Sequence, residues 1–530
     1  MNDSCLQFNS VPAVKHPLVG DADVLAMMKR YEYSEDTRRL IRDENLLPGG
    51  LLNRLQAEYP QHSALMEKRP FLFIDRDNYT GLKGFRAVVE VLKQYGIDIG
   101  HIEEREFFVE VYRFLATRHT LNMINWDDCH KDSIFQLCFA QPGMIDKDAV
   151  GQYLAAGSAE ARSEIAAAYK ERTNPHDGKQ KLNKPWFERD SGEIEFLDGS
   201  QHKYPQTQLI FDTTTQNCFS YCTYCFRHAQ VRSDEDMFLQ KDIAQFHDYL
   251  RRHPEVTDLL ITGGDAGYMP PNRFAQYVIP IIEDPALRHV KNIRLGSRLL
   301  TFQPEMILRH KYDKMLELFD TLRDNGLQVA WMAHFSTPRE VLNPSTLAAI
   351  RRLQNHGVVV RSQSPIMNHI SLFTDEAGKV DVERSAQNWI DLANILGMLG
   401  VGFHSMYCAR PTGEHHYFAA PLADIEQVFN RIYRSLSSIN RPSRHISMTI
   451  SAGKLSILGT AVVNGEQCFA LQFTEARNMA WMDRVILAKY DAHEKKIDLL
   501  KPFDTEKFFF EDELKEIEGE LEGALKKRLT

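Results

Sequence analysis

Apolar residues between about 205 and 410 fall into short strand-like runs separated by longer segments with helical spacing. Strands that alternate with helix-sized segments predict a repeated β/α unit with parallel strand pairing. We therefore expect an α/β fold in which a parallel sheet curls into a partial or full barrel, with functional groups at the carboxyl ends of its strands. The strand-like runs are QLIFDTT (208–214), DLLITGG (258–264), NIRLGSR (292–298), VAWMAHF (329–335), VVVRSQSPI (358–366) and VGFHSMYC (401–408).

The regions on either side of this repeat show different patterns. Residues 1–200 combine helical spacing with breaker-rich stretches at 173–178 and 183–185, and predict a helical amino-terminal region followed by a crossover. Residues 201–440 hold the β/α repeat, and 441–530 add a carboxyl-terminal extension that ends in a charged helix. Such a helix is typical of docking or of a subunit contact. Its apolar positions are Leu514, Ile517, Leu521 and Leu525.

The composition is that of a soluble enzyme, with 43% hydrophobic and 25% charged residues and a formal charge of −9. No apolar run reaches the roughly 18 residues that span a bilayer, and the first 20 residues resemble neither a signal peptide nor an anchor. Net acidity argues against general nucleic-acid binding. We expect a cytoplasmic protein with neither a membrane nor a nucleic-acid partner.

Three cysteines directly after the first predicted strand form the motif C-x3-C-x2-C: Cys218, Cys222 and Cys225. A [4Fe-4S] cluster bound by only three thiolates leaves one iron open for another ligand, and S-adenosylmethionine can occupy it. The other five cysteines are scattered without metal-type pairing. Three buried thiols, or part of a zinc site with a distant fourth ligand, are the alternatives.

The motif and its surroundings resemble the radical SAM enzymes, and more closely their lysine 2,3-aminomutase group. The resemblance covers about residues 200–495. It implies three cofactors, a [4Fe-4S] cluster, S-adenosylmethionine and pyridoxal 5′-phosphate (PLP), and a flavodoxin or ferredoxin-type reductant. The segments that carry it are HKYP (202–205), the cysteine loop ending in Arg227, LLITGGD (259–265), IRLGSR (293–298), AHFSTP (333–338), SQSP (362–365) and AGK (452–454).

The strand ends are expected to bind S-adenosylmethionine. Gly263 and Gly264 allow close backbone approach, and Asp265 offers a carboxylate to a cationic or hydroxyl group. A simple turn is the alternative for this G-G-D segment. The resemblance places further residues against the same cofactor: Gly296, Ser297, Arg298, His334 and Gln363.

Lys454, on a turn of small residues, is the expected Schiff-base lysine for PLP. Partial burial would help its amine to lose a proton. An exposed lysine on a turn is the alternative. By resemblance, Lys203 and Tyr204 bind the phosphate, whereas Thr207 stands where the family usually has a second arginine.

Substrate choice departs from the lysine-specific pattern. Arg227 matches the arginine that binds the amino acid carboxylate. Two aspartates that hold the lysine ammonium in that group are replaced by Ala409 and Ser447, so lysine is an unexpected substrate. Arg410 either receives a distal carboxylate, as in a glutamate-like amino acid, or points to solvent.

The leading hypothesis is an aminomutase that moves an α-amino group of a small amino acid substrate to the β-carbon. A radical SAM enzyme without PLP chemistry, acting on a small molecule or a protein lysine, is the first alternative. A non-catalytic iron-sulfur electron-transfer or regulatory protein is the second. Only Cys468 stands where the lysine enzymes carry a zinc-binding cysteine cluster, so no structural zinc is expected, and a homo-oligomer is possible.

Overall fold

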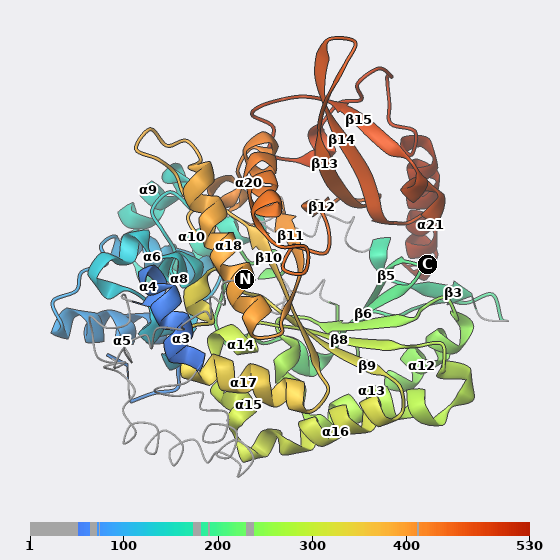
Figure 1. The fold of residues 1–530 in the computed structure, drawn as a ribbon, viewed down its shortest axis with the longest axis horizontal. Helices are drawn as coiled ribbons and strands as arrows, with labels where there is room; N and C mark the ends of the chain where they lie inside the picture. Colours follow the sequence, from blue (N-terminus) through green and yellow to red (C-terminus); the bar gives the residue numbers. More distant parts are fainter. Residues whose placement is uncertain are drawn as a thin grey trace, which may run out of the picture.

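The computed structural model describes residues 51–63, 72–73, 75–172, 182–188, 191–228, 238–410 and 413–529. Its centre is a sheet of eleven strands in the order β15-β14-β13-β12-β11-β10-β9-β8-β7-β6-β5 (Figure 1). Neighbouring strands from β6 to β11 pair in parallel, which confirms the predicted α/β fold with a parallel, barrel-type sheet. These strands are β6 (Thr207–Phe211), β7 (Asp258–Thr262), β8 (Asn292–Ser297), β9 (Gln328–Ala333), β10 (Val359–Ile366) and β11 (Gly402–Cys408).

Helices cover the outer face of these strands, and apolar residues at helical spacing make them amphipathic. In α13 (Pro271–Glu283), Phe274, Tyr277, Val278 and Ile281 are buried. Alternate residues of β7 and β8 face the helices and are likewise buried, while the intervening residues line the inner side of the curved sheet. The other covering helices are α12 (Ile243–Arg252), α16 (Asp313–Asp324), α17 (Pro344–Asn355), α18 (Val382–Met398) and α20 (Leu422–Ser435), and shorter helices are α14 (Leu299–Phe302), α15 (Glu305–Leu308) and α19 (His415–Phe418).

Additional strands extend the sheet at both ends. β5 (Ser200–Tyr204) pairs antiparallel with β6. At the other end, β12 (Ser447–Thr449) joins β11, and β13 (Gly453–Val463), β14 (Glu466–Ala476) and β15 (Val485–Lys489) continue antiparallel. β5 also contacts β14, so the sheet curls until its two ends meet.

The amino-terminal helices lie on the side of the barrel covered by α14 and α18 (Figure 1). The predicted stretch at 173–178 lies outside the described residues, as does the amino-terminal segment 1–50. A small sheet pairs β1 (Asn78–Thr80) with β2 (Leu115–Thr117), and β3 (Trp186–Glu188) pairs with β4 (Ile194–Phe196). The helices here are α3 (Leu51–Glu58), α4 (Pro60–Ser63), α5 (Gly81–Gln94), α6 (Ile102–Val111), α7 (Arg118–Met123), α8 (Ser133–Cys138), α9 (Lys147–Ala155) and α10 (Ala159–Arg172).

The charged terminal helix, α21 (Glu511–Leu529), packs on its own chain beside β14 and β15 (Figure 1). Glu513 accepts a hydrogen bond from the Trp481 indole at 2.7 Å, and Glu518 accepts one from the Ser451 hydroxyl. Within the described ranges, none of the helices combines the length and apolarity needed to cross a bilayer.

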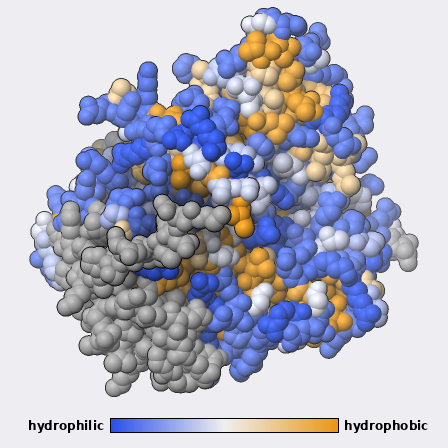
Figure 2. All heavy atoms as spheres, in the orientation of Figure 1, coloured by the Kyte–Doolittle hydropathy of each residue, from blue (hydrophilic) through white to orange (hydrophobic). Residues whose placement is uncertain are grey.

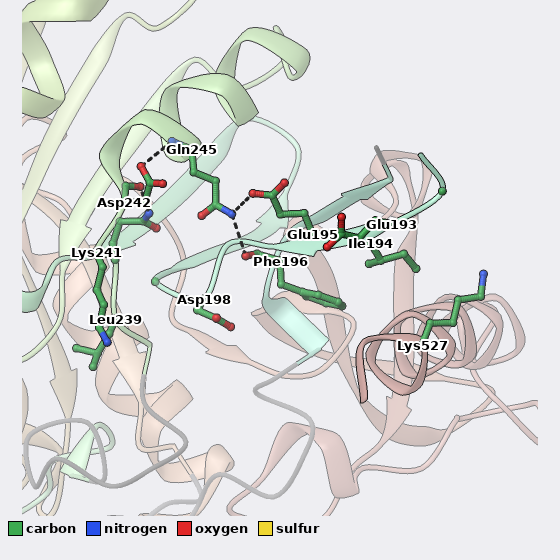
Figure 3. A pocket seen from close by; sticks show the side chains of 13 residues that line it. Glu193, Ile194, Glu195, Phe196, Asp198, Leu239, Lys241, Asp242, Gln245 and Lys527 are labelled. Atoms are coloured by element: carbon green, nitrogen blue, oxygen red, sulfur yellow. Dashed lines mark hydrogen bonds between the residues drawn. The ribbon is translucent and has the colours of Figure 1, made fainter. Parts of the chain in front are cut away.

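The surface shows two features away from the barrel interior. Figure 2 shows apolar residues gathered where Figure 1 places β13 to β15, and Val462 and Val485 are exposed there. A hollow of about 540 Å³ lies between β4, the start of α12 and Lys527 of α21, and Figure 3 shows the side chains that line it. Carboxylates such as Glu193 and Asp242 line it, and none of the predicted site residues does.

Candidate active site

The cysteine loop follows β6 and is anchored to the amino-terminal region. The Tyr221 amide donates to the Leu115 carbonyl of β2 at 2.7 Å, and the Thr223 amide donates to the Leu137 carbonyl of α8 at 2.9 Å. The Thr223 hydroxyl donates to the Gln136 carbonyl at 2.7 Å. Residues between the cysteines thus fix the loop, and the amino-terminal helices serve as its support.

The three cysteine thiols are partly buried and lie within electrostatic reach of one another. Burial raises the pKa of Cys218 well above its usual range, and Cys225 adds to the effect. Burial also raises the pKa of Cys222 to about 11, although the Arg298 cation opposes it. Neutral thiols are therefore favoured until cationic iron offsets the cost of thiolates. Three thiols are chemically suited to iron, although in this structure no three His, Cys, Asp or Glu side chains of the described residues are arranged as a metal site.

Gly263 and Gly264 make room for the cysteine loop itself. A Cβ on Gly264 would come within 2.6 Å of the Asn217 carbonyl oxygen and 3.0 Å of the Cys218 sulfur. Gly263 has φ +139°, which favours glycine, and a Cβ there would meet the Thr215 hydroxyl at 2.5 Å. The Gly264 amide donates to the Thr215 carbonyl at 2.8 Å, so this donor is already used within the protein.

Asp265 is buried and is satisfied by neighbouring strand ends. It accepts hydrogen bonds from the Ser297 hydroxyl at 2.6 Å, the Gly267 amide at 2.8 Å and the Arg298 amide at 2.8 Å. Burial nevertheless raises its pKa to about 6. Within the protein, Ser297 is the hydroxyl partner of Asp265, and the carboxylate ties the β7 end to the β8 end, where Gly296 also lies.

The Arg298 guanidinium lies behind the cysteine loop. It donates to the Tyr224 hydroxyl at 2.7 Å and to Glu340 and the Ser336 hydroxyl at 3.3 Å each. Its positive charge opposes the rise in the pKa of Cys222 that burial causes, and so favours the thiolate. The structure therefore places Arg298 next to the cysteines, where it is held by three side chains.

His334, Gln363 and Tyr407 form a hydrogen-bonded chain across the inner side of the sheet. The Tyr407 hydroxyl donates to Gln363 Oε1 at 3.0 Å, which orients the amide so that its Nε2 donates to His334 Nε2 at 3.2 Å. Burial and the Arg298 cation lower the pKa of His334 to about 3, so the ring is neutral and its Nε2 accepts. Tyr407 thereby connects the predicted S-adenosylmethionine residues to the lysine side of the barrel.

Lys454 lies on β13, paired with Thr449 of β12 and Glu475 of β14, so the predicted turn is wrong. Its ammonium forms an ion pair with Glu475, and its Nζ lies 5.8 Å from the ring centre of Tyr204 and 5.7 Å from that of Tyr407. The side chain is 15% exposed, which excludes the exposed-lysine alternative.

The protonation of Lys454 also differs from the sequence-based expectation. Burial alone would lower its pKa, but Tyr407, Glu475 and Tyr204 outweigh burial and raise it. Burial would likewise raise the pKa of Glu475, but Lys454 and then Arg444 lower it to about 2. Lys454 is therefore held as an ammonium by Tyr407, by the Glu475 carboxylate on β14 and by Tyr204.

Lys203 and Tyr204 reach the lysine site because the sheet curls. The Lys203 ammonium donates to the Ile450 carbonyl, in the loop just before Lys454. Burial lowers the pKa of Lys203 well below its usual range, and the cations of Arg477, Arg410 and Lys454 add to this. Thr207 lies on β6, the strand that pairs with the β5 strand of Lys203 and Tyr204, and is buried.

Arg227 and Arg410 converge on one aromatic ring. Their guanidinium carbons lie 5.0 Å and 4.9 Å from the ring centre of Phe226. Burial and then the Arg410 charge lower the pKa of Arg227 to about 9, and burial lowers that of Arg410. Within the part of the chain that the structure describes, no carboxylate pairs with either guanidinium. Arg410 thus does not project freely into solvent.

The two positions that lack the lysine-type aspartates are buried. Ala409 is 4% exposed and Ser447 is 2% exposed, and neither carries a charge. Ser447 pairs with Tyr407 across β11 and β12, so it lies beside the lysine site.

Comparison with known proteins supports the resemblance. No family model matches the chain. A putative L-lysine 2,3-aminomutase of Aquifex aeolicus is 28% identical over 264 residues, which cover 50% of this chain and 65% of that protein. The glutamate 2,3-aminomutase of Clostridioides difficile is 27% identical over 169 residues, 32% of this chain and 37% of the relative. The L-lysine 2,3-aminomutase of Clostridium subterminale is 29% identical over 176 residues, 33% and 39% of the two chains.

The chain is thus similar, over part of its length, to proteins named lysine 2,3-aminomutase and glutamate 2,3-aminomutase. It spans 65% of the first relative and less than half of the other two. The similarity does not fix the substrate, since the relatives are named for lysine and for glutamate. A radical SAM methyltransferase of known structure, from Sphaerobacter thermophilus, aligns over 69% of this chain and 93% of its own at 15% identity with a TM-score of 0.30, which is too low to argue from.

Sequence reasoning from the family motifs missed four site residues: Phe226, Tyr407, Glu475 and Arg477. Phe226 and Tyr407 each lie next to a predicted residue or strand end, so their aromatic character was an available signal. Glu475 and Arg477 lie more than 20 residues beyond Lys454, and only the β13–β14 pairing brings them back to it.

Proposed function

We propose that this protein is a radical SAM, PLP-dependent 2,3-aminomutase whose substrate is an amino acid with a second, distal anionic group. The observation that carries the proposal is the pair of guanidinium groups, Arg227 and Arg410, that share the Phe226 ring without a carboxylate partner among the described residues. Burying two like charges together costs several kcal/mol unless an anion compensates them. A dicarboxylic amino acid would supply one carboxylate to each arginine.

The expected cofactors match the residues that would hold them. Cys218, Cys222 and Cys225 would bind three irons of a [4Fe-4S] cluster, and Lys454, whose Nζ lies near the Tyr204 and Tyr407 rings, would bind PLP. When bound, these groups with S-adenosylmethionine supply hydrogen abstraction and a covalent carrier for the migrating amino group.

The chain's own residues orient the substrate and handle one proton. Arg227 would bind the α-carboxylate through paired N–H groups, and Arg410 the distal one. Before its Nζ can act as a nucleophile, Lys454 must lose a proton, and Glu475 Oε2 is the adjacent acceptor. Once Lys454 is neutral, the larger of the two charges that lower the Glu475 pKa is gone and only Arg444 remains, so the carboxyl accepts the proton more readily.

The lysine substrate of several relatives fits less well. A lysine ammonium would find Ala409 and Ser447 instead of carboxylates and would lie near the Arg410 cation. The relative from Clostridioides difficile is named for glutamate, which agrees with an acidic substrate. A flavodoxin or ferredoxin-type reductant and a homo-oligomer remain part of the proposal.

One alternative has an observation in its favour. The Glu475 ion pair holds Lys454 as an ammonium, as it would if the lysine were structural and the enzyme worked without PLP on a small molecule or a protein lysine.

A substrate screen separates these functions. Anaerobic enzyme with a reconstituted cluster is incubated with reductant, S-adenosylmethionine, PLP and, in turn, glutamate, aspartate, glutamine and lysine. We expect a β-amino acid from an acidic substrate and little from lysine. Product formed equally well without PLP would support the alternative, and no reductive cleavage of S-adenosylmethionine would favour a non-catalytic iron-sulfur protein.

A further inference from the structure

Two cations from opposite ends of the sheet hold the loop just before Lys454. Lys203 of β5 donates to the Ile450 carbonyl, and Arg477 Nε donates to the adjacent Ser451 carbonyl at 3.0 Å. The Arg477 amide also donates to the Ala452 carbonyl at 3.0 Å. Both side chains are therefore fixed beside one short loop.

Each of these cations has N–H groups that do not donate to a described residue. An ammonium has three N–H groups, and Lys203 gives one to Ile450. Arg477 gives its Nη2 to Asn183 Oδ1 at 2.6 Å, and no described residue accepts from its Nη1. A group placed beyond the loop would meet donors from both residues.

The charges around the loop are not balanced. Glu475 already pairs with Lys454 and Arg444, which leaves Glu518 of α21 as the other carboxylate near Lys203 and Arg477. The described cations that share this region are Lys203, Arg410, Arg444, Lys454 and Arg477. Partly buried cations in excess over carboxylates favour an anionic ligand.

We propose that Arg477 and Lys203 together bind the phosphate of PLP, with Arg477 supplying the second cation that Thr207 does not provide. This inference rests on the proposed function. Glu518, which accepts from the Ser451 hydroxyl, lies close enough to oppose the incoming phosphate. β14 thereby contributes Glu475, the proton acceptor of Lys454, and Arg477 of the phosphate site follows directly after this strand.

The test compares PLP with pyridoxal, which has the same aldehyde and no phosphate. Dissociation constants for both are measured by absorbance titration and by borohydride trapping on Lys454, without substrate or reductant. In Arg477→Gln, PLP binding should weaken by about 10- to 100-fold, as expected when a charged hydrogen bond is lost, while pyridoxal binding stays unchanged. Inorganic phosphate should compete with PLP in the wild type and less well in this variant.

Two further variants guard against a folding artefact. Arg477→Lys keeps the charge and should recover part of the PLP preference. Glu518→Gln removes the opposing carboxylate and should tighten PLP by about 2- to 5-fold, again without changing pyridoxal binding. Thermal melting and circular dichroism establish that each variant is folded.

The outcomes separate the inference from the proposed function. Equal weakening of pyridoxal and PLP in Arg477→Gln, or unchanged PLP binding, would overturn the role of Arg477 while leaving PLP on Lys454 intact. Wild-type protein that binds neither compound at Lys454 would overturn the inference together with the proposed function.

Discussion

The polar groups behind the cysteine loop and the arginine pair on Phe226 differ in how their buried charge is compensated. Behind the loop, Asp265 accepts three hydrogen bonds and Arg298 donates to three side chains, although the buried Arg298 Nε has no partner among the described residues. Arg227, two residues past Cys225, and Arg410 share a ring, and no described carboxylate pairs with them. The first region is mostly paired within the protein, and the second is arranged for anions that come from outside.

The difference follows from what each region must bind. A cluster requires thiolates at fixed positions. In a rigid loop the cysteines already hold these positions, so little conformational entropy is lost when the cluster binds. Anionic ligands require cations whose desolvation is compensated only when the ligand arrives. The predictions below test this contrast, beginning with the largest expected effect.

Replacing one cysteine should remove the function of the scaffold entirely. In Cys222→Ser the hydroxyl is a poor iron ligand, so iron, sulfide and reductive cleavage of S-adenosylmethionine should fall to background after anaerobic reconstitution. Cys468→Ala, at a buried cysteine on β14 far along the sheet, is the matched control and should keep its cluster. A fully loaded Cys222→Ser protein would show that the cysteine loop is not the cluster site.

Removing Arg410 should change substrate preference at the lysine end. Loss of a charged hydrogen bond is worth about 1.5–3 kcal/mol, so Arg410→Ala should lower kcat/KM for an acidic amino acid by about 10- to 100-fold. The kcat/KM for the neutral amide of the same amino acid should change little. Arg227→Ala should lower both values alike, because it binds the carboxylate that all amino acids share. An equal loss for both substrates in Arg410→Ala would contradict a distal-anion site.

Removing Glu475 should shift the pH dependence of Lys454 labelling. Glu475 keeps the pKa of Lys454 raised, so labelling in the wild type requires high pH, and the ion pair is present below the folded pKa and lost as pH rises through it. In Glu475→Gln the charge and the hydrogen bond of Glu475 are lost while burial still opposes the ammonium, so the pKa of Lys454 should fall. The pH midpoint for trapping pyridoxal with borohydride should then move down by about one unit or more, a tenfold change at a fixed pH.

The folding stability of the same variant should depend less on acidic pH than that of the wild type. The folded pKa of Glu475, about 2, lies below its ordinary value of 4.5, so this ion pair stabilises the wild type above pH 4.5 and is lost as pH falls toward 2. Thermal melting of Glu475→Gln should depend less steeply on pH between these values. An unchanged labelling midpoint and an unchanged melting profile would contradict the ion pair.

The smallest effect is expected at Tyr407. Tyr407→Phe removes one hydrogen bond from Gln363 and leaves the amide free to rotate, which is worth about 0.5–1.5 kcal/mol. Turnover should fall by about 2- to 10-fold, and reductive cleavage of S-adenosylmethionine uncoupled from product should increase. Gln363→Glu, whose carboxylate accepts from Tyr407 but cannot donate to the neutral His334, should show the same uncoupling.

The parallel core was predictable from the sequence because each strand is a continuous apolar run and each connection is helix-sized. The cysteine loop was predictable because its chemistry lies within eight residues. The lysine end was predicted less well. Lys454 was expected on a turn and lies on β13, where pairing with β14 adds Glu475 and raises the pKa that burial was expected to lower.

The residues that were missed share a physical reason. Arg477 comes to Lys203 only because the ends of an eleven-stranded sheet meet, a closure that local patterns do not encode. The close packing of Gly263 and Gly264 against Thr215 and Asn217 of the cysteine loop region was likewise not predicted, and their role toward a cofactor stays a prediction.

Borohydride reduction of anaerobic wild-type protein with PLP, followed by peptide mass mapping, tests the central claim most directly. The account predicts a pyridoxyl adduct on Lys454, on the peptide that carries β13. Saturating PLP with no adduct on Lys454 would contradict the claim that the cations at this end of the barrel are arranged for that cofactor.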